Sequence, residues 1–129
     1  MLQSSTFNFL EDLKENNNKS WFDKNRKIYE LAKADFYTTV DTLINGIADF
    51  DESIRNLKAK DCLFRINRDI RFSKDKSPYK TNMGAYFNKG GKKINTAGYY
   101  FHFEPGGSFI AGGFHMPMPP ELARNKTRD

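Results

Sequence analysis

The sequence has a single cysteine, Cys62, and no long apolar run among its 129 residues. One cysteine excludes an internal disulfide framework and fits a reducing compartment. No stretch approaches the ~20 apolar residues of a membrane-spanning helix. The first residues, MLQSSTFNFLEDLKENNN, lack a basic region followed by an apolar one, so we do not interpret them as a signal peptide. We therefore expect a cytoplasmic protein that does not enter a membrane.

Apolar residues are few, but many of them carry rings. Hydrophobic types make up 38% of the chain and aromatic types 15%, with 12 Phe and 6 Tyr. We expect a core built more from rings than from aliphatic side chains. The length suits one domain over residues 1–129. The C-terminal MPMPPELARNKTRD begins a helical pattern and then stops, so we expect the chain to be the N-terminal part of a longer domain.

The N-terminal part predicts helices. Apolar residues at helical spacing predict a short amphipathic helix over residues 5–15. Ser20 and Asp23 resemble a capping box and predict the start of another helix. From there an apolar residue recurs every three or four positions, which predicts one long helix over 20–49, or two helices joined near 33–35.

After residue 60 the apolar period changes to two, as in strands. Three stretches are candidate strands: residues 62–66, 81–88 and 97–104. In the last of these, Tyr99, Phe101 and Phe103 share one face, which we interpret as a core face. PGG at 105–107 predicts a turn, after which SFIAGGFH returns as the second strand of a hairpin. Helices followed by antiparallel strands define the α+β class, with the sheet formed by residues about 61–115.

One basic segment, RINRDIRFSKDKSPYKT at 65–81, stands out. Residues 58–80 contain eight basic and three acidic side chains, a local net charge of +5 that equals the net charge of the whole chain. A concentrated excess of this kind indicates an anionic partner. Arginine suits such a partner because its planar fork makes paired hydrogen bonds to phosphate or carboxylate.

We expect Arg65, Arg68 and Arg71 to converge where a strand ends in a turn, with Asp69 orienting one guanidinium. Three further residues would complete this site: Lys76 and Lys80 as point charges, and Tyr79 as a hydroxyl donor or stacking face. If the domain is an enzyme, Asp69, Lys76 and Tyr79 are its acid–base candidates. The alternative is an ion-pair network in which Asp69 neutralises Arg68 or Arg71 and the lysines face water.

The motif Arg65-Ile-Asn-Arg68-Asp69-Ile-Arg71-Phe72, followed by Lys76 and Pro78-Tyr79-Lys80, resembles the signature of a family known as domain of unknown function 2461. FLEDLKENNNKSWFDKNRKIYE and GYYFHFEPGGSFIAGGFHMPMPPEL extend the resemblance over nearly the whole chain, while ELARNKTRD departs from the expected continuation. The resemblance implies no activity, substrate or cofactor. It marks hallmark positions without roles: Arg65, Arg68, Asp69, Arg71, Phe72, Lys76 and Tyr79.

Other candidates are weaker. His102 and Glu104 could share a strand face as metal ligands, but neither His115 nor Cys62 stands at a spacing that supplies a third. We expect hairpin-rim residues there, and no metal or cofactor. NKGGKK at 88–93 predicts a hairpin turn edged by lysines that could add charge to the same site.

Three functions follow from these patterns. The first is a domain that binds a small phosphate- or carboxylate-bearing ligand through Arg65, Arg68, Arg71 and Lys76. The second is a nucleic-acid-binding module that uses the same segment against backbone phosphates. The third is a structural or interaction domain held by an ion-pair network. A sheet edge left exposed would also favour a homodimer.

Overall fold

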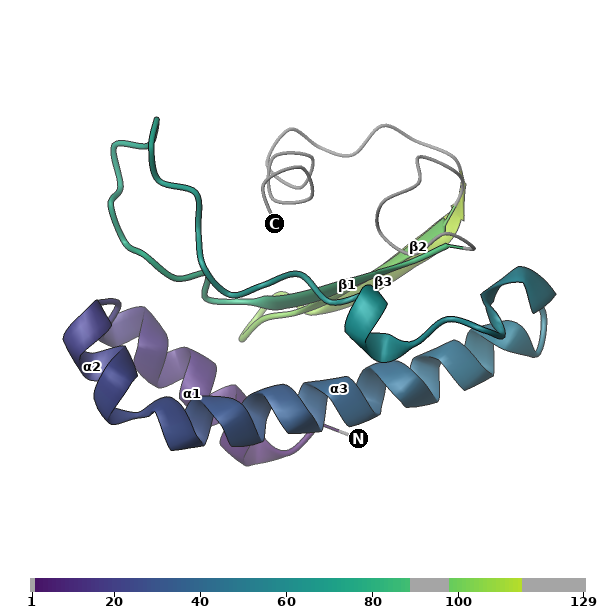
Figure 1. Cartoon of the computed structure of the whole chain (residues 1–129), viewed down its shortest axis with the longest axis horizontal. Coiled ribbons are helices and arrows are strands. Elements are labelled where there is room, and N and C mark those ends of the chain that lie inside the picture. Colours follow the sequence, from purple (N-terminus) through teal and green to yellow (C-terminus); the bar gives the residue numbers. More distant parts are fainter. Residues whose placement is uncertain (1, 89–97, 115–129) are drawn as a thin grey trace.

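The helices lie under one face of a three-stranded antiparallel sheet in the computed structural model, which describes residues 2–88 and 98–114 (Figure 1). The sheet order is β1-β2-β3. This arrangement confirms the predicted α+β class. The elements in chain order are α1 (Ser4–Glu15), α2 (Lys19–Lys24), α3 (Arg26–Ala48), the 3-10 turns η1 (Glu52–Ile54) and η2 (Ala59–Asp61), β1 (Met83–Phe87), β2 (Gly98–Phe103) and β3 (Phe109–Phe114).

The long helical region divides at Asn25, and not near residues 33–35 as the apolar pattern allowed. The Asn25 side chain donates to the carbonyl of Trp21 at 2.9 Å, and its backbone leaves the helical region at φ −110° and ψ 20°. Asparagine competes with the helix in this way because its amide offers the backbone an alternative partner. The cap of α2 is Asn18, whose side chain accepts from the Trp21 N–H at 2.8 Å, so the capping box predicted at Ser20 is wrong.

Helix α1, predicted over residues 5–15, is confirmed, and a side chain of α3 holds its first turn. The Asp35 carboxylate accepts from the Gln3 N–H at 2.8 Å and from the Thr6 hydroxyl at 2.6 Å. Thr6 is 1% exposed, so its hydroxyl has lost water and depends on this partner. A carboxylate beside a helix N-terminus also interacts favourably with the helix dipole.

Replacing Asp35 by alanine should lower the free energy of unfolding by about 1–3 kcal/mol, because the buried Thr6 hydroxyl loses its acceptor. Chemical denaturation measures the change. Asp41→Ala, an exposed position on the same helix, is the control and should change stability by less than about 0.5 kcal/mol. Equal losses in the two variants would contradict this account.

Strands β2 and β3 confirm the predicted hairpin, and β1 confirms the strand predicted at 81–88. Met83 pairs with Phe103 and Phe87 with Tyr99, while β3 returns antiparallel along β2. The predicted turn lies at residues 105–107, where Gly106 adopts φ 81°, a conformation that glycine tolerates. The face predicted to carry Tyr99, Phe101 and Phe103 packs against the core.

Tyr99, near the start of β2, connects the sheet to the segment between α3 and η1. Its hydroxyl donates to Asp51 at 2.8 Å, which lowers the pKa of Asp51 together with the stronger effect of the Ser53 hydroxyl. The Tyr99 ring lies across Gly112, its partner on β3, where a Cβ atom would overlap ring atoms. Glycine at this position therefore lets the ring cover the neighbouring strand.

The strand predicted over residues 62–66 is wrong. Only Leu63 forms a bridge, to Ala85, with the Phe64 N–H donating to Gly84 and the Tyr86 N–H to Cys62. Pairing with β1 is limited to the residues around Leu63, directly after η2 (Ala59–Asp61). The chain then leaves the edge of β1 and begins a long loop. Three predictions lie outside the described residues: the turn at 88–93 beyond its first residue, the position of His115, and the C-terminal helical pattern.

Candidate functional site

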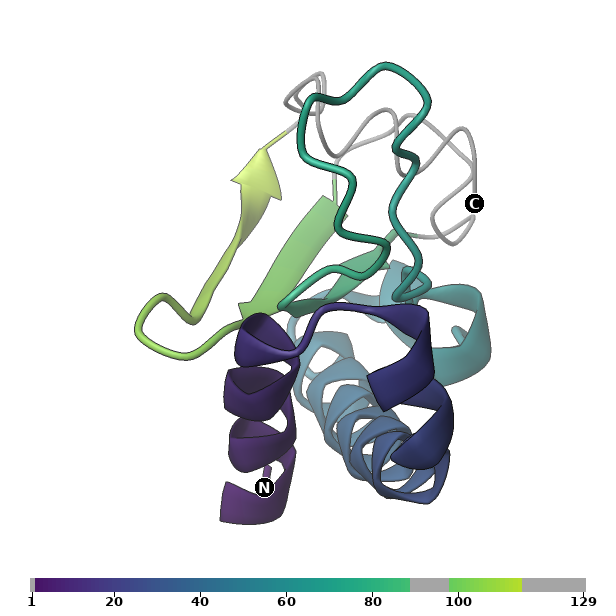
Figure 2. The ribbon, with the colours of Figure 1, turned by 90° about the vertical axis from the view of Figure 1, so that its left-hand side faces the viewer.

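Residues 65–80 form a loop that rises from the sheet on the side opposite the helices (Figures 1 and 2). We call it the arginine loop. Its two ends pair as a short ladder: the Arg68 N–H donates to Pro78 at 2.9 Å, and the Lys80 N–H donates to Ile66 at 2.8 Å. Asn67 and Tyr79 form the bridge between these bonds. The ladder holds the two ends of the arginine loop together.

Arg68 is held by its own loop. Its Nη1 donates to the carbonyls of Ser77 at 2.9 Å and Asp75 at 3.4 Å, and its Nη2 donates to Ser73 Oγ at 3.4 Å. The side chain is 28% exposed, and the Asp75 carboxylate lies 3.5 Å from it. The pKa of Asp75 is lowered, first by the Ser77 hydroxyl and N–H and then by Arg68. The guanidinium is therefore fixed in position without depending on a buried carboxylate.

Arg71 and Lys76 also form hydrogen bonds within the arginine loop. Arg71 binds Asp69 through two bonds, Nε to Oδ1 at 3.1 Å and Nη2 to Oδ2 at 3.0 Å, which raises the pKa of Arg71. Lys76 Nζ donates to the carbonyl of Ile70 at 2.8 Å. The pairing of Asp69 with one arginine was expected of both an anion site and an ion-pair network, so it does not decide between them.

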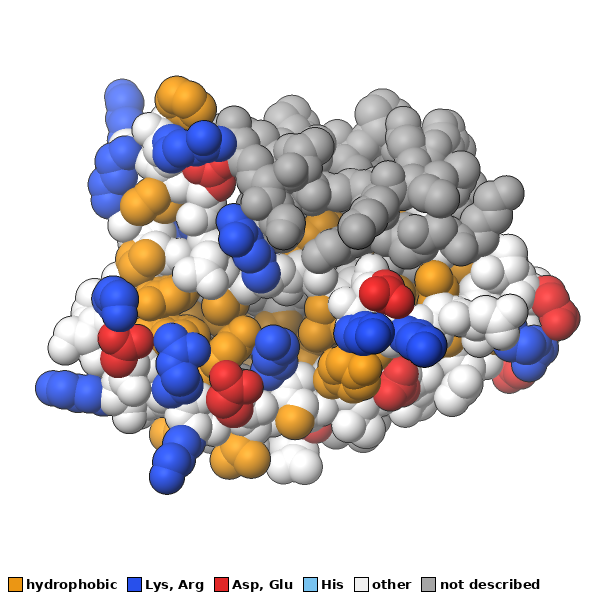
Figure 3. All heavy atoms as spheres, in the orientation of Figure 1, with side chains coloured by type: hydrophobic (Ala, Val, Ile, Leu, Met, Phe, Trp, Pro, Cys, Tyr) orange, Lys and Arg blue, Asp and Glu red, His pale blue; other side chains and the backbone are white. Residues whose placement is uncertain are grey.

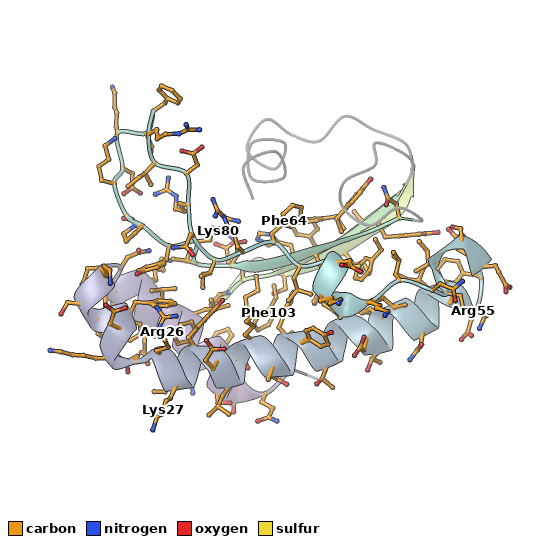
Figure 4. The ribbon with its side chains drawn as sticks, viewed as in Figure 1. Arg26, Lys27, Arg55, Phe64, Lys80 and Phe103 are labelled. Carbon is orange, nitrogen blue, oxygen red and sulfur yellow. The ribbon has the colours of Figure 1, made fainter. Side chains whose placement is uncertain are left out.

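Tyr79 fastens the arginine loop to the helices. The Asn17 side chain donates to the Tyr79 carbonyl at 2.9 Å and accepts from the Tyr79 N–H at 3.0 Å. The Tyr79 ring stacks on Phe22 with 4.1 Å between centroids and 16° between planes. Next to it, Lys80 is buried, and its ammonium donates to the Arg65 carbonyl and lies 5.7 Å from the centre of the Phe64 ring (Figure 4).

Asn17→Asp should loosen the arginine loop, because a carboxylate can accept from the Tyr79 N–H but cannot donate to its carbonyl. We expect a loss of about 1–3 kcal/mol and faster hydrogen exchange at the Arg68 and Lys80 amides. Asn16→Asp is the control, since the Asn16 amide donates to the backbone carbonyl of Asp12 at the C-terminal end of α1 and does not contact the arginine loop through that bond. Unchanged exchange at both amides in Asn17→Asp would refute the proposed attachment.

A pocket of about 660 Å³ lies between the arginine loop, the end of α1 and the start of β1, and we call it the loop pocket. Its walls include Lys14, Asn17, Arg68, Asp69, Tyr79 and Lys80. Four of the seven predicted binding residues thus meet at one cavity. The other three lie elsewhere: Arg71 and Lys76 are not among the described lining residues, and Arg65 lines a different pocket.

That second pocket, the helix groove, has a volume of about 580 Å³ and lies between α2, the first half of α3 and residues 60–67. Tyr79 and Asn82 line both pockets and form the wall between them. Figure 3 shows hydrophobic side chains gathered between the helices and the arginine loop, with basic and acidic side chains around them. The helical cations here, Lys19, Arg26 and Lys33, were missed from the sequence, although their spacing of seven residues is a readable signal.

His102 and Glu104 share a face with Tyr100 as a hydrogen-bonded chain. His102 Nε2 lies 2.7 Å from Glu104 Oε1, and His102 Nδ1 lies 2.8 Å from the Tyr100 hydroxyl. The tautomer with its proton on Nε2 satisfies both contacts, since Nε2 then donates to Glu104 and Nδ1 accepts from the Tyr100 hydroxyl. Burial, with a smaller effect of Glu104, raises the pKa of Tyr100 to about 12. Within residues 2–88 and 98–114, no group of three potential ligands is placed to hold a metal ion.

Because the pKa of Tyr100 is raised, the folded state keeps this phenol protonated at pH values where a tyrosine in the unfolded chain has lost its proton. This contribution to stability is present below about pH 10 and is lost as the pH rises toward about 12. Between about pH 9 and about pH 11, the wild-type protein should lose about 1 kcal/mol more stability than Tyr100→Phe. Urea denaturation at the two pH values measures this difference, and parallel losses would show that Tyr100 titrates normally.

The fold and the pockets define a small α+β protein with a self-supported arginine loop beside two adjoining cavities. Residues 5–128 match the model of the family described as "Conserved hypothetical protein (DUF2461)", and the chain belongs to this family. This match confirms the resemblance seen in the sequence. No curated protein and no solved structure matches the chain. Among the described helices, none combines the length and the apolar character needed to cross a membrane.

Proposed function

We propose that the protein binds a small phosphate- or carboxylate-bearing ligand in the loop pocket, with Arg68 as the principal contact. The observation that carries this proposal is the guanidinium of Arg68, held at the pocket wall by two carbonyls and a hydroxyl of its own loop. Arginine has five N–H donors, and these three bonds leave donors for a ligand. A fixed guanidinium binds more tightly because less entropy is lost on binding.

The charges around the pocket support the same ligand class. Lys14 and Lys80 line it with Arg68, and the Asp69 carboxylate is already bound by Arg71. Asp75 is the remaining acid of the described lining, and its carboxylate accepts from the Ser77 N–H at 2.9 Å and the Ser77 hydroxyl at 2.7 Å. A cavity of about 660 Å³ has the size of small-molecule sites.

Arg68→Gln should weaken binding of inorganic phosphate or pyrophosphate by about 10- to 100-fold, the cost of losing a charged hydrogen bond. Lys74→Gln is the control, because Lys74 is an exposed cation of the same loop that does not line the pocket among the described residues. Titration calorimetry gives the affinities, and melting temperatures show whether each variant folds.

Equal weakening in both variants would instead favour general attraction to a basic loop. A collapse of stability in Arg68→Gln, with no phosphate binding by the wild-type protein, would favour the ion-pair network as the sole role of the segment.

The alternative function is binding of nucleic-acid backbones, which the excess of cations at 58–80 favours. Affinity would then rise with oligonucleotide length and fall steeply with salt, whereas the loop pocket saturates with a monomeric anion. Of the three acid–base candidates, Asp69 and Tyr79 line the pocket, whereas the Lys76 ammonium donates to the Ile70 carbonyl. The cytoplasmic location and the homodimer stay predictions from the sequence.

A further inference from the structure

The helix groove carries a charged stripe that the arginine loop does not explain. Along α2 and α3, the stripe runs through Lys19, Asp23, Arg26, Glu30 and Lys33, each three or four residues after the last, and all five line the groove. Lys19 and Asp23 share a face of α2, and Arg26, Glu30 and Lys33 share a face of α3; both faces line the groove. The opposite wall adds Lys60 and Arg65, so the described lining contains five cations and two acids.

The acids of the stripe do not cancel its cations. Asp23 is shared by two of them, with Lys19 Nζ at 2.7 Å and Arg26 Nη2 at 3.4 Å. The hydrogen bond from Lys19 lowers the pKa of Asp23, so this carboxylate stays ionised and keeps both cations at the rim. Lys33 and Lys60 are exposed lysines facing the same hollow from opposite walls. The groove therefore keeps an excess of positive charge across its mouth.

The interior of the groove is aromatic. Phe22, Tyr29, Phe64 and Tyr79 are among its lining rings, and two of these, Phe22 and Tyr79, stack on each other. The Arg26 guanidinium lies over the Phe22 ring, 5.0 Å from its centre, so one cation already packs on an aromatic face. In Figure 4, Arg26 belongs to the lower wall of the groove and Phe64 to its upper wall. Such walls favour a flat aromatic group over a hydrated inorganic ion.

We propose that the helix groove is a second binding site, which takes a planar aromatic group bearing a phosphate or carboxylate. The ring of the ligand packs among the aromatic side chains, and its anionic group is bound by Lys33, Lys60 and Arg65 at the mouth. This site goes beyond the proposed function because it is a different cavity, separated from the loop pocket by Tyr79 and Asn82. Its volume of about 580 Å³ suits a ligand of one or two rings.

The experiment uses 1-naphthyl phosphate as the probe, with inorganic phosphate and neutral 1-naphthol as comparators. Calorimetry of the whole chain should show the probe binding more than about tenfold tighter than either comparator at the groove. The double variant Lys33→Gln/Lys60→Gln should weaken the probe by about tenfold. Lys27→Gln is the matched control, since Lys27 is an exposed lysine of α3 whose side chain points away from the groove (Figure 4).

The two sites can be told apart. Arg68→Gln should leave the affinity of the helix groove for naphthyl phosphate unchanged. If the loop pocket also binds the probe, that second binding event is the one that Arg68→Gln removes. Loss of probe binding in Arg68→Gln, with no effect of the double lysine variant, would overturn the proposal and place the probe in the loop pocket. Equal affinity for 1-naphthol would also overturn it, as would preferential binding of oligonucleotides with affinity that grows with length.

Discussion

The attachment of Tyr79 to the helices is the constraint on which the two cavities depend. One amide side chain, Asn17, satisfies both backbone groups of Tyr79, and Phe22 receives its ring. The hydrogen bonds join residues 62 positions apart in the chain, so these contacts set the place of the arginine loop relative to α1 and α2. Because Tyr79 lines both cavities, its position also decides their shapes.

Charge in this protein is organised at two levels. Within the arginine loop, Asp69 pairs with Arg71, and loop carbonyls accept from Lys76 and Arg68, so these three cations also hold the shape of the loop. Between the loop and the helices, cations from distant segments face shared hollows. A count of charges along the chain finds the first level. The second depends on which segments the fold brings together.

The sequence predicts the fold class, α1 and the β2–β3 hairpin because each has a strong local period or a turn signal. The break at Asn25 and the cap at Asn18 were missed because each depends on the hydrogen bond of one asparagine side chain, which a continuous apolar pattern does not reveal. The strand predicted at 62–66 is wrong because alternation cannot reveal that pairing with β1 ends after Phe64. The candidate site was found in part: Arg68, Asp69, Tyr79 and Lys80 meet, but the place of Arg65 depends on tertiary packing that spacing does not encode.

The pairing of Tyr99 with Gly112 has a consequence for how sequences of this fold can drift. Any side chain larger than hydrogen at position 112 meets the ring. The ring is held by the bond of its hydroxyl to Asp51 and by Phe50, whose ring centre lies 6.1 Å away and nearly perpendicular to it. Loss of the ring would leave a glycine uncovered in a strand, which weakens it. Substitutions at these two positions are therefore tolerated together more readily than singly, so a natural variant with a bulkier residue at one should carry a smaller residue at the other.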